Sequence, residues 1–420
     1  MLVIGGGGRE HALCWALRRS PRVSDVVCAP GNAGIAQIAT CLAVQQDTVE
    51  DMLRVTETVM PDLVVIGPEV PLAAGIVDAL LARGIRTFGP TQAAARLESS
   101  KAFSKDFLQR HGIPTARYVV ADTIEIAHEA LNGFTLPVVV KADGLAAGKG
   151  VVIAETLEDA QQAVTDLLVP GGSLVLEEFL QGEEISFFAL CDGEHAAAIA
   201  AAQDHKRIGE GDTGPNTGGM GAYSTDALLP DALRTWLLTH VAQPTVDGMR
   251  AEGCPFRGIL FCGIILCADG PKVLEFNTRW GDPETEAILL RMDTDILDLI
   301  DASIDGTADT LHVAMKPGAS VAVIAASAGY PASAEKGVVI HGLDAALPVG
   351  VEVFQAGTAF AVDGATVTAG GRVLAVTAVA DNLRRALGKV YEAMGNLSFA
   401  GMQYRRDIGH RALRKDQEQG

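Results

Sequence analysis

The chain has 420 residues, 48% of them hydrophobic and 20% charged, and carries a formal net charge of −19. Its length predicts two to four domains, and its acidic balance argues against a surface for nucleic acid or anionic membranes. The seven cysteines contain no CxxC pair, and no apolar run approaches the roughly 18 residues of a membrane helix. The sequence thus predicts a cytoplasmic protein with reduced thiols and no structural zinc.

Residues 1–100 alternate short apolar runs with helical patterns. The runs at 2–5, 25–29, 62–67 and 85–89 indicate short buried strands, and helical stretches such as "REHALCWALRRS" lie between them. Strands that alternate with helices are typical of a parallel sheet. We therefore expect a small parallel α/β domain at the N-terminus.

Two further domains are expected after residue 100. Residues 101–310 open with a helical pattern and contain a shorter alternation of strands and helices at 118–191, which suggests a small α+β lid. Residues 311–420 carry repeated short strands with glycine turns, followed by a helical pattern. The predicted fold class is therefore α/β and α+β multidomain, with a C-terminal domain that is mostly β.

A glycine turn occurs near the start of the chain, in "VIGGGGREHA". A dinucleotide fingerprint beginning at Gly5 would need glycine at position 10, where Glu10 stands, and the next predicted strand lacks the expected acidic end. What remains is a strand, a glycine turn and a helix N-terminus, which is a common site for one phosphate. A plain tight turn is the alternative interpretation.

A second glycine segment, "KADGLAAGKG" at 141–150, differs from a P-loop. Its two inner glycines are separated by only three residues, and Lys149 is followed by Gly150 rather than by Ser or Thr. Apolar runs on both sides indicate a flap between two strands. Lys101, Lys141 and Lys149 bracket this flap. A lone lysine is usually solvated, but three around one glycine loop suggest a polyphosphate cradle.

The segment "LVLEEFLQGEE" suggests two strands joined by a linker that contains Phe179 and Leu180. Apolar side chains there would sandwich a base, and a carboxylate such as that of Glu184 would hold ribose hydroxyls. An ordinary connection with solvated glutamates is the alternative.

The segment "VLEFNTRWGDPETE" places an acid and an amide on one face of a predicted strand. Glu275 and Asn277 are two residues apart and so point to the same side. A carboxylate and an amide oxygen are hard ligands that suit Mg2+. Arg279 follows on the same alternation and is suited to a transferring phosphoryl group. Asp282 and the proline after it predict a helix start with Asp282 as the N-cap.

The segment "DHKRIGEGDTGPNTGGMGAY", residues 204–223, has six glycines and no aliphatic run. This composition predicts a loop whose backbone approaches a small polar substrate closely. A flexible surface loop is the alternative.

With these motifs in order, the chain resembles the ATP-grasp superfamily and, within it, the phosphoribosylamine–glycine ligase family. The match runs along essentially the whole chain, through "GGGGREHAL", "APGNAG", "GPEVPL", "LESSKAFSKDFL", "KADGLAAGKGV", "EEFLQGEE", "EFNTRWGDPETE" and "GGRVLAVTA". The stretch "DTGPNTGGMG" is its most specific part. Trp280 stands where the family usually has phenylalanine, and the sequence offers no clear third metal ligand.

The resemblance implies ATP and Mg2+ (or Mn2+) as cofactors, with Glu275 and Asn277 as metal ligands. The implied ATP contacts are Lys101, Lys141, Gly148, Lys149, Gly150, Glu177, Glu178, Phe179, Leu180 and Glu184. The implied contacts of the phosphoribosylamine phosphate are Gly6, Gly7, Gly8 and Arg9. The implied glycine site is formed by Asp212, Thr213, Pro215, Asn216, Thr217, Gly218, Gly219 and Arg279. Catalytic roles are implied for Arg279, Lys141 and Asp212.

The implied chemistry is acyl activation in purine biosynthesis: ATP phosphorylates the glycine carboxylate, and the amine of 5-phosphoribosylamine displaces the phosphate. Such catalysis needs positioning and charge neutralisation rather than a nucleophilic side chain. An ATP-grasp ligase for another small carboxylate and amine is the alternative. A non-catalytic nucleotide sensor would be expected to lose Glu275, Asn277 or Lys141, and all three are present. The implied partners are small substrates alone, without nucleic acid or membrane, and we expect a monomer.

Overall fold

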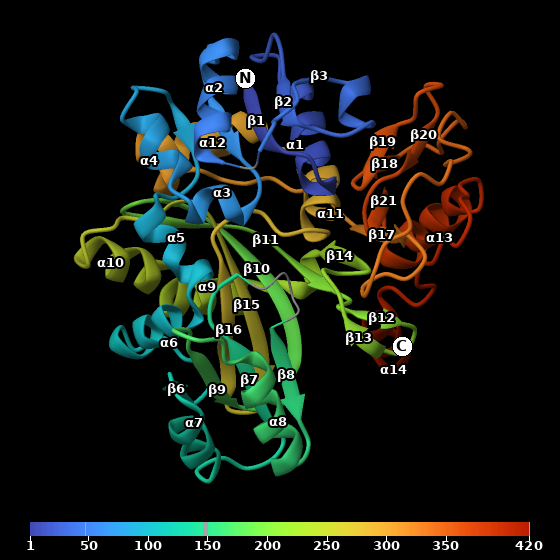
Figure 1. Ribbon diagram of the computed structural model, residues 1–420. Coiled ribbons are helices and arrows are strands. Elements are labelled where there is room, and N and C mark those ends of the chain that lie inside the picture. Colours follow the sequence, from blue (N-terminus) through green and yellow to red (C-terminus); the bar gives the residue numbers. More distant parts are fainter. Residues whose placement is uncertain (47, 146–149, 420) are drawn as a thin grey trace.

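The computed structural model describes residues 1–46, 48–145 and 150–419. Figure 1 shows the N-terminal domain at the top, the lid at the bottom and the C-terminal strands at one side, all arranged around central strands. No helix within these ranges is both long and apolar enough to cross a membrane. All seven cysteines are free thiols, as predicted.

The N-terminal domain contains the predicted parallel sheet, with five strands in the order β3-β2-β1-β4-β5. Leu2 and Ile4 pack toward one layer of helices and Val3 toward the other, because successive side chains of a strand point to opposite faces. The elements are β1 (Leu2–Gly5), α1 (Gly8–Arg19), β2 (Val27–Pro30), β3 (Thr40–Cys41), α2 (Val49–Val59), β4 (Val64–Ile66), α3 (Glu69–Ala73), α4 (Ile76–Leu81) and β5 (Thr87–Phe88).

Two consecutive helices lead from this domain to the lid: α5 (Gln92–Ser99) and α6 (Lys101–Arg110). Ser100 separates them, and its hydroxyl accepts a hydrogen bond from the backbone N–H of Phe103 at 3.1 Å. This N-cap satisfies one of the open amides of α6 and confirms the predicted helix start. Lys101 is therefore the first residue of α6.

The lid is a four-stranded antiparallel sheet in the order β6-β9-β7-β8, with two helices packed on one face. Strands β7 and β8 pair with Lys141 opposite Val151, so the glycine segment joins two paired strands, as the flap prediction requires. Gly148 and Lys149 lie outside the described residues. The elements are β6 (Tyr118–Ala121), α7 (Ile124–Leu131), β7 (Val138–Ala142), β8 (Val151–Ala154), α8 (Leu157–Leu167) and β9 (Leu174–Glu178).

An eight-stranded antiparallel sheet, in the order β16-β15-β10-β11-β14-β17-β21-β18, runs through the middle of the molecule. Phe187 packs against α6, α9 and α10 on one face, whereas Phe188 packs toward α11 and α12 on the other. The central elements are β10 (Glu183–Asp192), β11 (Ala196–Asp204), α9 (Asp231–Leu237), a π-helix (Leu238–Ala242), α10 (Gln243–Ala251), β15 (Arg257–Cys267), β16 (Gly270–Asn277), α11 (Glu284–Arg291) and α12 (Ile296–Asp305).

The C-terminal strands join this same sheet through the pairing of β14 (Gly221–Thr225) with β17 (Ala319–Ala326). The prediction of a mostly β C-terminal region is confirmed, and the sheet continues across residue 310, where the sequence suggests a domain boundary. The elements are β17 (Ala319–Ala326), β18 (Val351–Gln355), β19 (Thr358–Phe360), β20 (Thr366–Thr368), β21 (Arg372–Ala380), α13 (Leu383–Met394) and α14 (His410–Gln419), and short 3-10 turns lie at Ile35–Gln37, Asp226–Leu228 and Ala308–Thr310.

The glycine-rich segment 204–223 is more regular than the predicted loop. It contains β12 (Arg207–Gly209), β13 (Thr213–Asn216) and the first residues of β14 (Gly221–Thr225), and β12 pairs with β13. The sequence pattern did not indicate these strands, because their pairing depends on the backbone and on small residues rather than on an aliphatic run. A Cβ at Gly209 would lie 2.5 Å from Oγ1 of Thr213, so the ribbon needs glycine there.

Candidate functional site

A cavity of about 1420 Å3 lies between the lid, the central sheet and the C-terminal strands, and a pocket of about 140 Å3 adjoins it at α6. Most predicted site residues line these walls. The larger cavity takes Arg9, Lys141, Glu177, Glu178, Phe179, Leu180, Glu184, Asp212, Asn216, Thr217, Gly218, Glu275, Asn277 and Arg279, and the smaller pocket also takes Lys101 and Gly150. Of the remaining described residues, Gly6, Gly7, Gly8, Thr213, Pro215 and Gly219 are wall residues of neither.

A buried carboxylate organises the lysines of the site. Glu177 Oε1 lies 2.9 Å from Lys141 Nζ, and Glu177 Oε2 lies 2.9 Å from Lys105 Nζ. Lys105 also donates to Oγ1 of Thr115 at 2.7 Å. Burial lowers the pKa of Lys105 to about 8, against the opposing attraction of Glu177. The side chain of Glu177, one of the implied ATP contacts, therefore faces the lysines.

The start of the flap is tied to the N-terminus of α6. The carboxylate of Asp143 accepts hydrogen bonds from the Ser100 hydroxyl at 3.1 Å and from the backbone N–H of Ala102 at 3.2 Å. An acid at a helix N-terminus is favourable because it meets unpaired amides and the positive end of the dipole. Lys101 Nζ donates to the carbonyl oxygen of Gly144 at 2.7 Å, and burial lowers its pKa.

The predicted nucleotide linker lies between β9 and β10. Phe179 lines the cavity and is 38% exposed. This exposure is high for a phenylalanine, since such side chains are mostly buried. Glu178 Oε1 accepts a hydrogen bond from the backbone N–H of Arg117 at 2.9 Å. Glu184 Oε2 accepts from Lys206 Nζ at 3.2 Å. Phe179 and Glu184 thus line the same cavity, and their contacts with a base and a ribose stay predictions.

Glu275 and Asn277 both face the cavity at the end of β16, which confirms their shared strand face. The Glu275 side chain is 44% exposed, and its Oε1 lies 3.8 Å from Lys206 Nζ. Burial alone would raise the pKa of Glu275, but Lys206 and Lys141 lower it below its ordinary value. An ionised carboxylate beside an amide oxygen is a donor set that fits Mg2+ or Mn2+.

Arg279 is held by acids that the sequence analysis did not single out. Its Nη2 lies 2.8 Å from Glu98 Oε1 in α5, and its Nε lies 3.2 Å from Glu69 Oε2 in the N-terminal domain. The second oxygen of Glu98 accepts from the backbone N–H of Thr278 at 2.7 Å. Glu69 occurs in "GPEVPL" and Glu98 in "LESSK". Neither motif indicated that its glutamate would pair with an arginine 180 or more positions away.

Backbone amides of the N-terminal glycine turn donate hydrogen bonds to two carboxylates of the protein itself. The backbone N–H of Gly7 donates to Glu10 Oε2 at 2.6 Å, and the backbone N–H of Arg9 donates to Asp282 Oδ2 at 3.3 Å. The Arg9 side chain is buried and donates to Glu10 Oε1 at 2.6 Å and to the Trp280 carbonyl at 3.0 Å. The predicted phosphate site thus combines helix amides with two neighbouring acids.

The prediction that Asp282 is an N-cap is wrong. Helix α11 begins at Glu284 and has Pro283 in the N-cap position. Arg372 of β21 draws the Asp282 carboxylate away, because its Nη2 lies 3.1 Å from Asp282 Oδ1. Arg372 also donates to the carbonyl of Gly218 at 2.6 Å, so it joins α11 to the glycine-rich segment.

Asp212 lies at the tip of the β12–β13 ribbon, and its carboxylate is engaged by two arginines. Arg405 Nη1 donates to its Oδ1 at 2.9 Å, and Arg411 Nη2 donates to its Oδ2 at 2.5 Å. Burial alone would raise the pKa of Asp212, but these two arginines lower it to about 2. Sequence reasoning found Asp212 but missed both partners, which lie almost 200 positions further along the chain.

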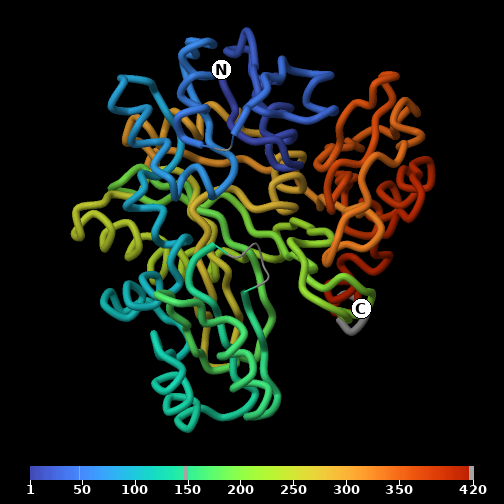
Figure 2. Tube along the Cα trace, in the orientation of Figure 1, coloured from blue at the N-terminus to red at the C-terminus, as the bar shows by residue number. Residues whose placement is uncertain are grey.

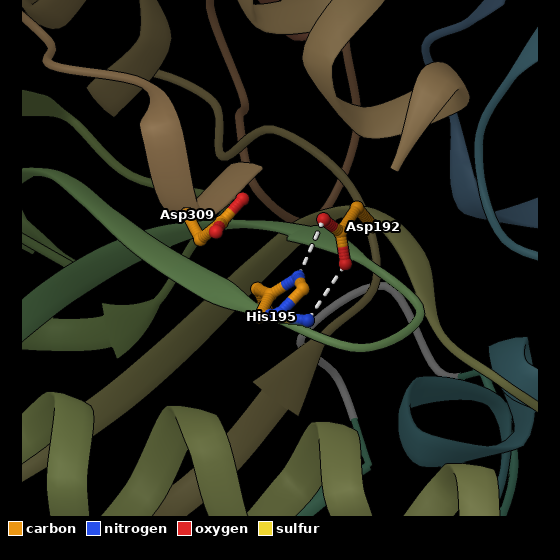
Figure 3. A group of neighbouring side chains, drawn as sticks. All are labelled: Asp192, His195 and Asp309. Carbon is orange, nitrogen blue, oxygen red and sulfur yellow. Dashed lines mark hydrogen bonds and ion pairs between the residues drawn. The ribbon is translucent and has the colours of Figure 1, made fainter. Parts of the chain in front are cut away.

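A second group of metal-binding residue types lies at the other end of β10, whose first residues Glu183 and Glu184 line the cavity. Ligand atoms of Asp192, His195 and Asp309 are within 4.8 Å of one another (Figure 3). However, Asp192 already accepts from the backbone N–H groups of Glu194, His195 and Ala308 at 2.6 to 2.9 Å, and from His195 Nδ1 at 3.1 Å. These bonds saturate the carboxylate, so the group closes a turn rather than forming a metal site.

Comparison with known proteins gives one consistent result over the chain. Family models of phosphoribosylglycinamide synthetase match in order: the N domain at residues 1–98, the ATP-grasp domain at 99–285 and the C domain at 320–411. The phosphoribosylamine–glycine ligase of Xanthomonas campestris is 48% identical over 427 residues, covering 100% of this chain and 99% of the relative. That of Ralstonia nicotianae is 47% identical over 422 residues, covering 99% and 100%. The chain belongs to the phosphoribosylamine–glycine ligase family.

Solved structures agree with this assignment to the phosphoribosylamine–glycine ligase family. The crystal structure of the Thermotoga maritima ligase superposes with a TM-score of 0.80 at 34% identity, covering 97% of this chain and 99% of that one. The biotin carboxylase of Campylobacter jejuni, solved as a β-γ-ATP complex, gives a TM-score of 0.73 at 15% identity and covers 97% and 93%. The second likeness shows the shared ATP-grasp fold alone.

Proposed function

We propose that this chain joins glycine to 5-phosphoribosylamine in an ATP-dependent ligation that yields glycinamide ribonucleotide, ADP and phosphate. The observation that carries the proposal is the meeting of Lys141, Glu275 and Arg279 in one cavity. Membership of the ligase family supports it. The reaction belongs to purine biosynthesis, and the protein acts in the cytoplasm. We propose that it is a monomer, and sedimentation of the purified protein tests this oligomeric state.

ATP occupies the lid side of the cavity in this proposal. The base lies at Phe179 and Leu180, and Glu184 holds the ribose. Lys101 and Lys141 bind phosphate oxygens, and the buried charge of Glu177 fixes Lys141 in place. Gly150, at the end of the flap, lets the backbone approach the phosphates closely.

Glu275 and Asn277 are the proposed ligands of Mg2+ or Mn2+. Both residues line the same cavity as Lys141 and Arg279, and Asn277 Oδ1 accepts from Arg279 Nη2 at 3.0 Å, so donor chemistry and location both suit a nucleotide-bound cation. When bound, the ion supplies charge neutralisation for the phosphoryl group that is transferred.

The two substrates occupy the opposite side of the cavity. Glycine is held by Arg279 and by the segment from Asp212 to Gly219. Phosphoribosylamine lies toward the N-terminal domain, where the carboxylate of Glu69 suits its hydroxyl groups. Carboxylates already accept hydrogen bonds from the backbone amides of Gly7 and Arg9. The phosphate of phosphoribosylamine therefore needs a positive charge nearby, which Arg372 supplies from the cavity wall.

The residues act by positioning and by electrostatics in the proposed reaction. A glycine carboxylate oxygen attacks the γ-phosphorus of ATP, and ADP leaves. The amine of phosphoribosylamine then attacks the acyl carbon, and phosphate leaves with one former glycine oxygen and one proton is released. Arg279 stabilises the developing negative charge, and two acids fix its guanidinium before substrate binds.

The experiment that tests this route uses glycine labelled with heavy oxygen in its carboxylate. The expected result is phosphate that carries one labelled oxygen per turnover, detected by mass spectrometry. Alanine in place of glycine is the matched control and should give little ADP. Unlabelled phosphate would exclude an acyl phosphate, and equal turnover with alanine would favour a ligase for another carboxylate.

A further inference from the structure

The last part of the chain is fastened to the ribbon that carries Asp212. We call residues 405–415 the C-terminal strap. Figures 1 and 2 show α14 lying beside β12 and β13. Besides the two arginine contacts with Asp212, four hydrogen bonds join the strap to segment 204–223. They are Gly211 N–H to Asp407 Oδ2 at 2.8 Å, Arg406 N–H to Glu210 Oε1 at 3.2 Å, Gly409 N–H to His205 Nε2 at 3.0 Å, and Arg405 Nη1 to the Arg207 carbonyl at 3.0 Å.

The backbone of Asp212 is strained. Its φ of 59° lies in the left-handed region, which a residue with a side chain rarely adopts. Aspartate tolerates this conformation better than most residues, but it is still unfavourable and persists only where its surroundings enforce it. The strap provides that enforcement, because both carboxylate oxygens of Asp212 are bound by arginines from outside the ribbon.

The two arginines differ in how replaceable they are. Arg405 is 1% exposed and shares its guanidinium between Asp212 and Asp407, at 2.9 and 2.8 Å. Arg411 is 36% exposed and lines the cavity. Removal of Arg411 should therefore weaken the hold on Oδ2 of Asp212 without opening the core, because His410 Nε2, at 3.5 Å, is left as the partner of that oxygen. Removal of Arg405 would leave two carboxylates without their guanidinium.

The strap also reaches the nucleotide side of the cavity. Arg411, Arg414 and Lys415 are all wall residues, and Lys415 forms an ion pair with Glu183, next to Glu184. The match to the family's C domain ends at residue 411, so Arg414 and Lys415 lie beyond the matched region. The strap therefore closes one side of the cavity between the ribbon and the first residues of β10.

We propose that Arg411 is a positioning residue for the amino-acid substrate. By fixing Asp212, it holds the ribbon and the following segment in the conformation that binds glycine. Since Asp212 has both oxygens occupied, it acts through the shape it gives the segment rather than as a free counter-ion for the ammonium group. This inference rests on the proposed function for the identity of the substrate alone.

The test compares Arg411→Met with Arg411→Lys in the full-length protein. We expect Arg411→Met to raise KM for glycine about tenfold, with KM for ATP and the melting temperature nearly unchanged. Arg411→Lys should recover part of the loss because it restores the charge. Arg385→Met is the matched control: Arg385 is an exposed arginine of α13 that pairs with Asp381 at 2.6 Å, and its loss should leave KM for glycine unchanged.

Hydrogen exchange of residues 207–217 provides a readout that needs no substrate. Arg411→Met should exchange faster there than wild type, and Asp212→Asn should add little more in the double variant, because both changes break the same contact. Unchanged exchange, or an equal rise in both KM values with a lower melting temperature, would overturn the inference. Absence of wild-type ligase activity would instead refute the proposed function and leave the exchange result to decide this one.

Discussion

Glu177 Oε1 lies 2.9 Å from Nζ of Lys141, and only 2% of the Glu177 side chain is exposed. The other oxygen of the same carboxylate lies 2.9 Å from Lys105 in α6. One buried negative charge is thus shared by two lysines from different elements. The lysine proposed to bind ATP phosphates is therefore held by a carboxylate whose second ion pair, with Lys105, links the lid to the helix before it.

Glu177→Gln is expected to weaken ATP binding and to destabilise the fold. Loss of the charge leaves two buried ammonium groups facing a neutral amide, and breaking a buried pair costs about 3–5 kcal/mol. We expect KM for ATP to rise at least tenfold, with a smaller effect on KM for glycine. Steady-state kinetics and thermal melting measure the two effects separately.

Two further variants show whether charge is the cause. Glu177→Gln with Lys105→Met should regain part of the lost stability, since it removes the uncompensated second charge. Glu158→Gln, on the exposed face of α8, is the matched control and should change neither quantity. A Glu177→Gln enzyme with normal KM for ATP would show that Lys141 needs no such support.

The metal-binding pair could be predicted because strand geometry is local. Residues two positions apart on a regular strand share a face whatever the rest of the chain does, so Glu275 and Asn277 reach the same cavity as expected. The pairing of β16 with β15 departs from simple alternation at Leu274, one residue before Glu275. Leu274 falls between the paired residues Val273 and Glu275 without a partner of its own, yet it also lines the cavity.

The ion pairs and side-chain hydrogen bonds of the site could not be predicted, because they join residues far apart in the sequence. Arg411 meets Asp212 from 199 positions away, and Arg9 meets the Trp280 carbonyl from 271 positions away. A motif shows that a residue is unusual but not which charge will face it. Asp282 illustrates this: its local pattern indicated an N-cap, and Arg372 in a later strand determined its actual partner.

Glu275→Ala is expected to abolish most turnover while the protein stays folded. The side chain is 44% exposed, so its loss leaves no cavity in the core. Loss of a metal ligand weakens charge neutralisation at the transferred phosphoryl group, and we expect a decrease of about 100-fold or more in kcat. Titration with Mg2+ should show a weakened apparent affinity.

Asp269→Ala is the control for this metal prediction. Asp269 lies in the turn of the same β15–β16 hairpin, is 67% exposed, and pairs with Lys272 at 2.8 Å. It should behave as wild type in the Mg2+ titration. A folded Glu275→Ala variant with a near-normal rate at saturating Mg2+ would show that Glu275 is not a ligand.

Gly6→Ala is expected to disturb the N-terminal glycine turn. A Cβ at Gly6 would lie 2.5 Å from the backbone oxygen of Gly31, and neither main chain can move aside easily. We expect a loss of about 1–3 kcal/mol in stability, as for other overpacked positions, and a raised KM for phosphoribosylamine.

Gly388→Ala tests the same substitution where space is free. A Cβ there meets nothing within 4 Å, and Gly388 lies inside α13. Alanine should stabilise this helix by roughly 0.5–1 kcal/mol, because glycine loses more backbone entropy on folding. Equal effects of the two substitutions would contradict the packing argument.

His205 is expected to make the protein sensitive to acid. It is fully buried, and its Nε2 accepts a hydrogen bond from the backbone N–H of Gly409 at 3.0 Å, which requires the neutral ring. Burial, assisted by the charges of Arg405 and Arg411, lowers its pKa to about 3. In the unfolded chain the pKa is about 6.5. Between these values the unfolded state binds a proton that the folded state does not, so stability falls as pH falls.

The measurement is the free energy of urea unfolding at several pH values between 7 and 4. His205 should contribute a slope of about 1.4 kcal/mol per pH unit below pH 6. His205→Gln keeps an acceptor for Gly409 but cannot take up the proton, so its stability should fall less steeply over this range. His240→Gln, at an exposed position, is the control and should follow wild type. Parallel curves for wild type and His205→Gln would mean that His205 does not titrate between the two states, and the acid sensitivity would then have to arise from other groups.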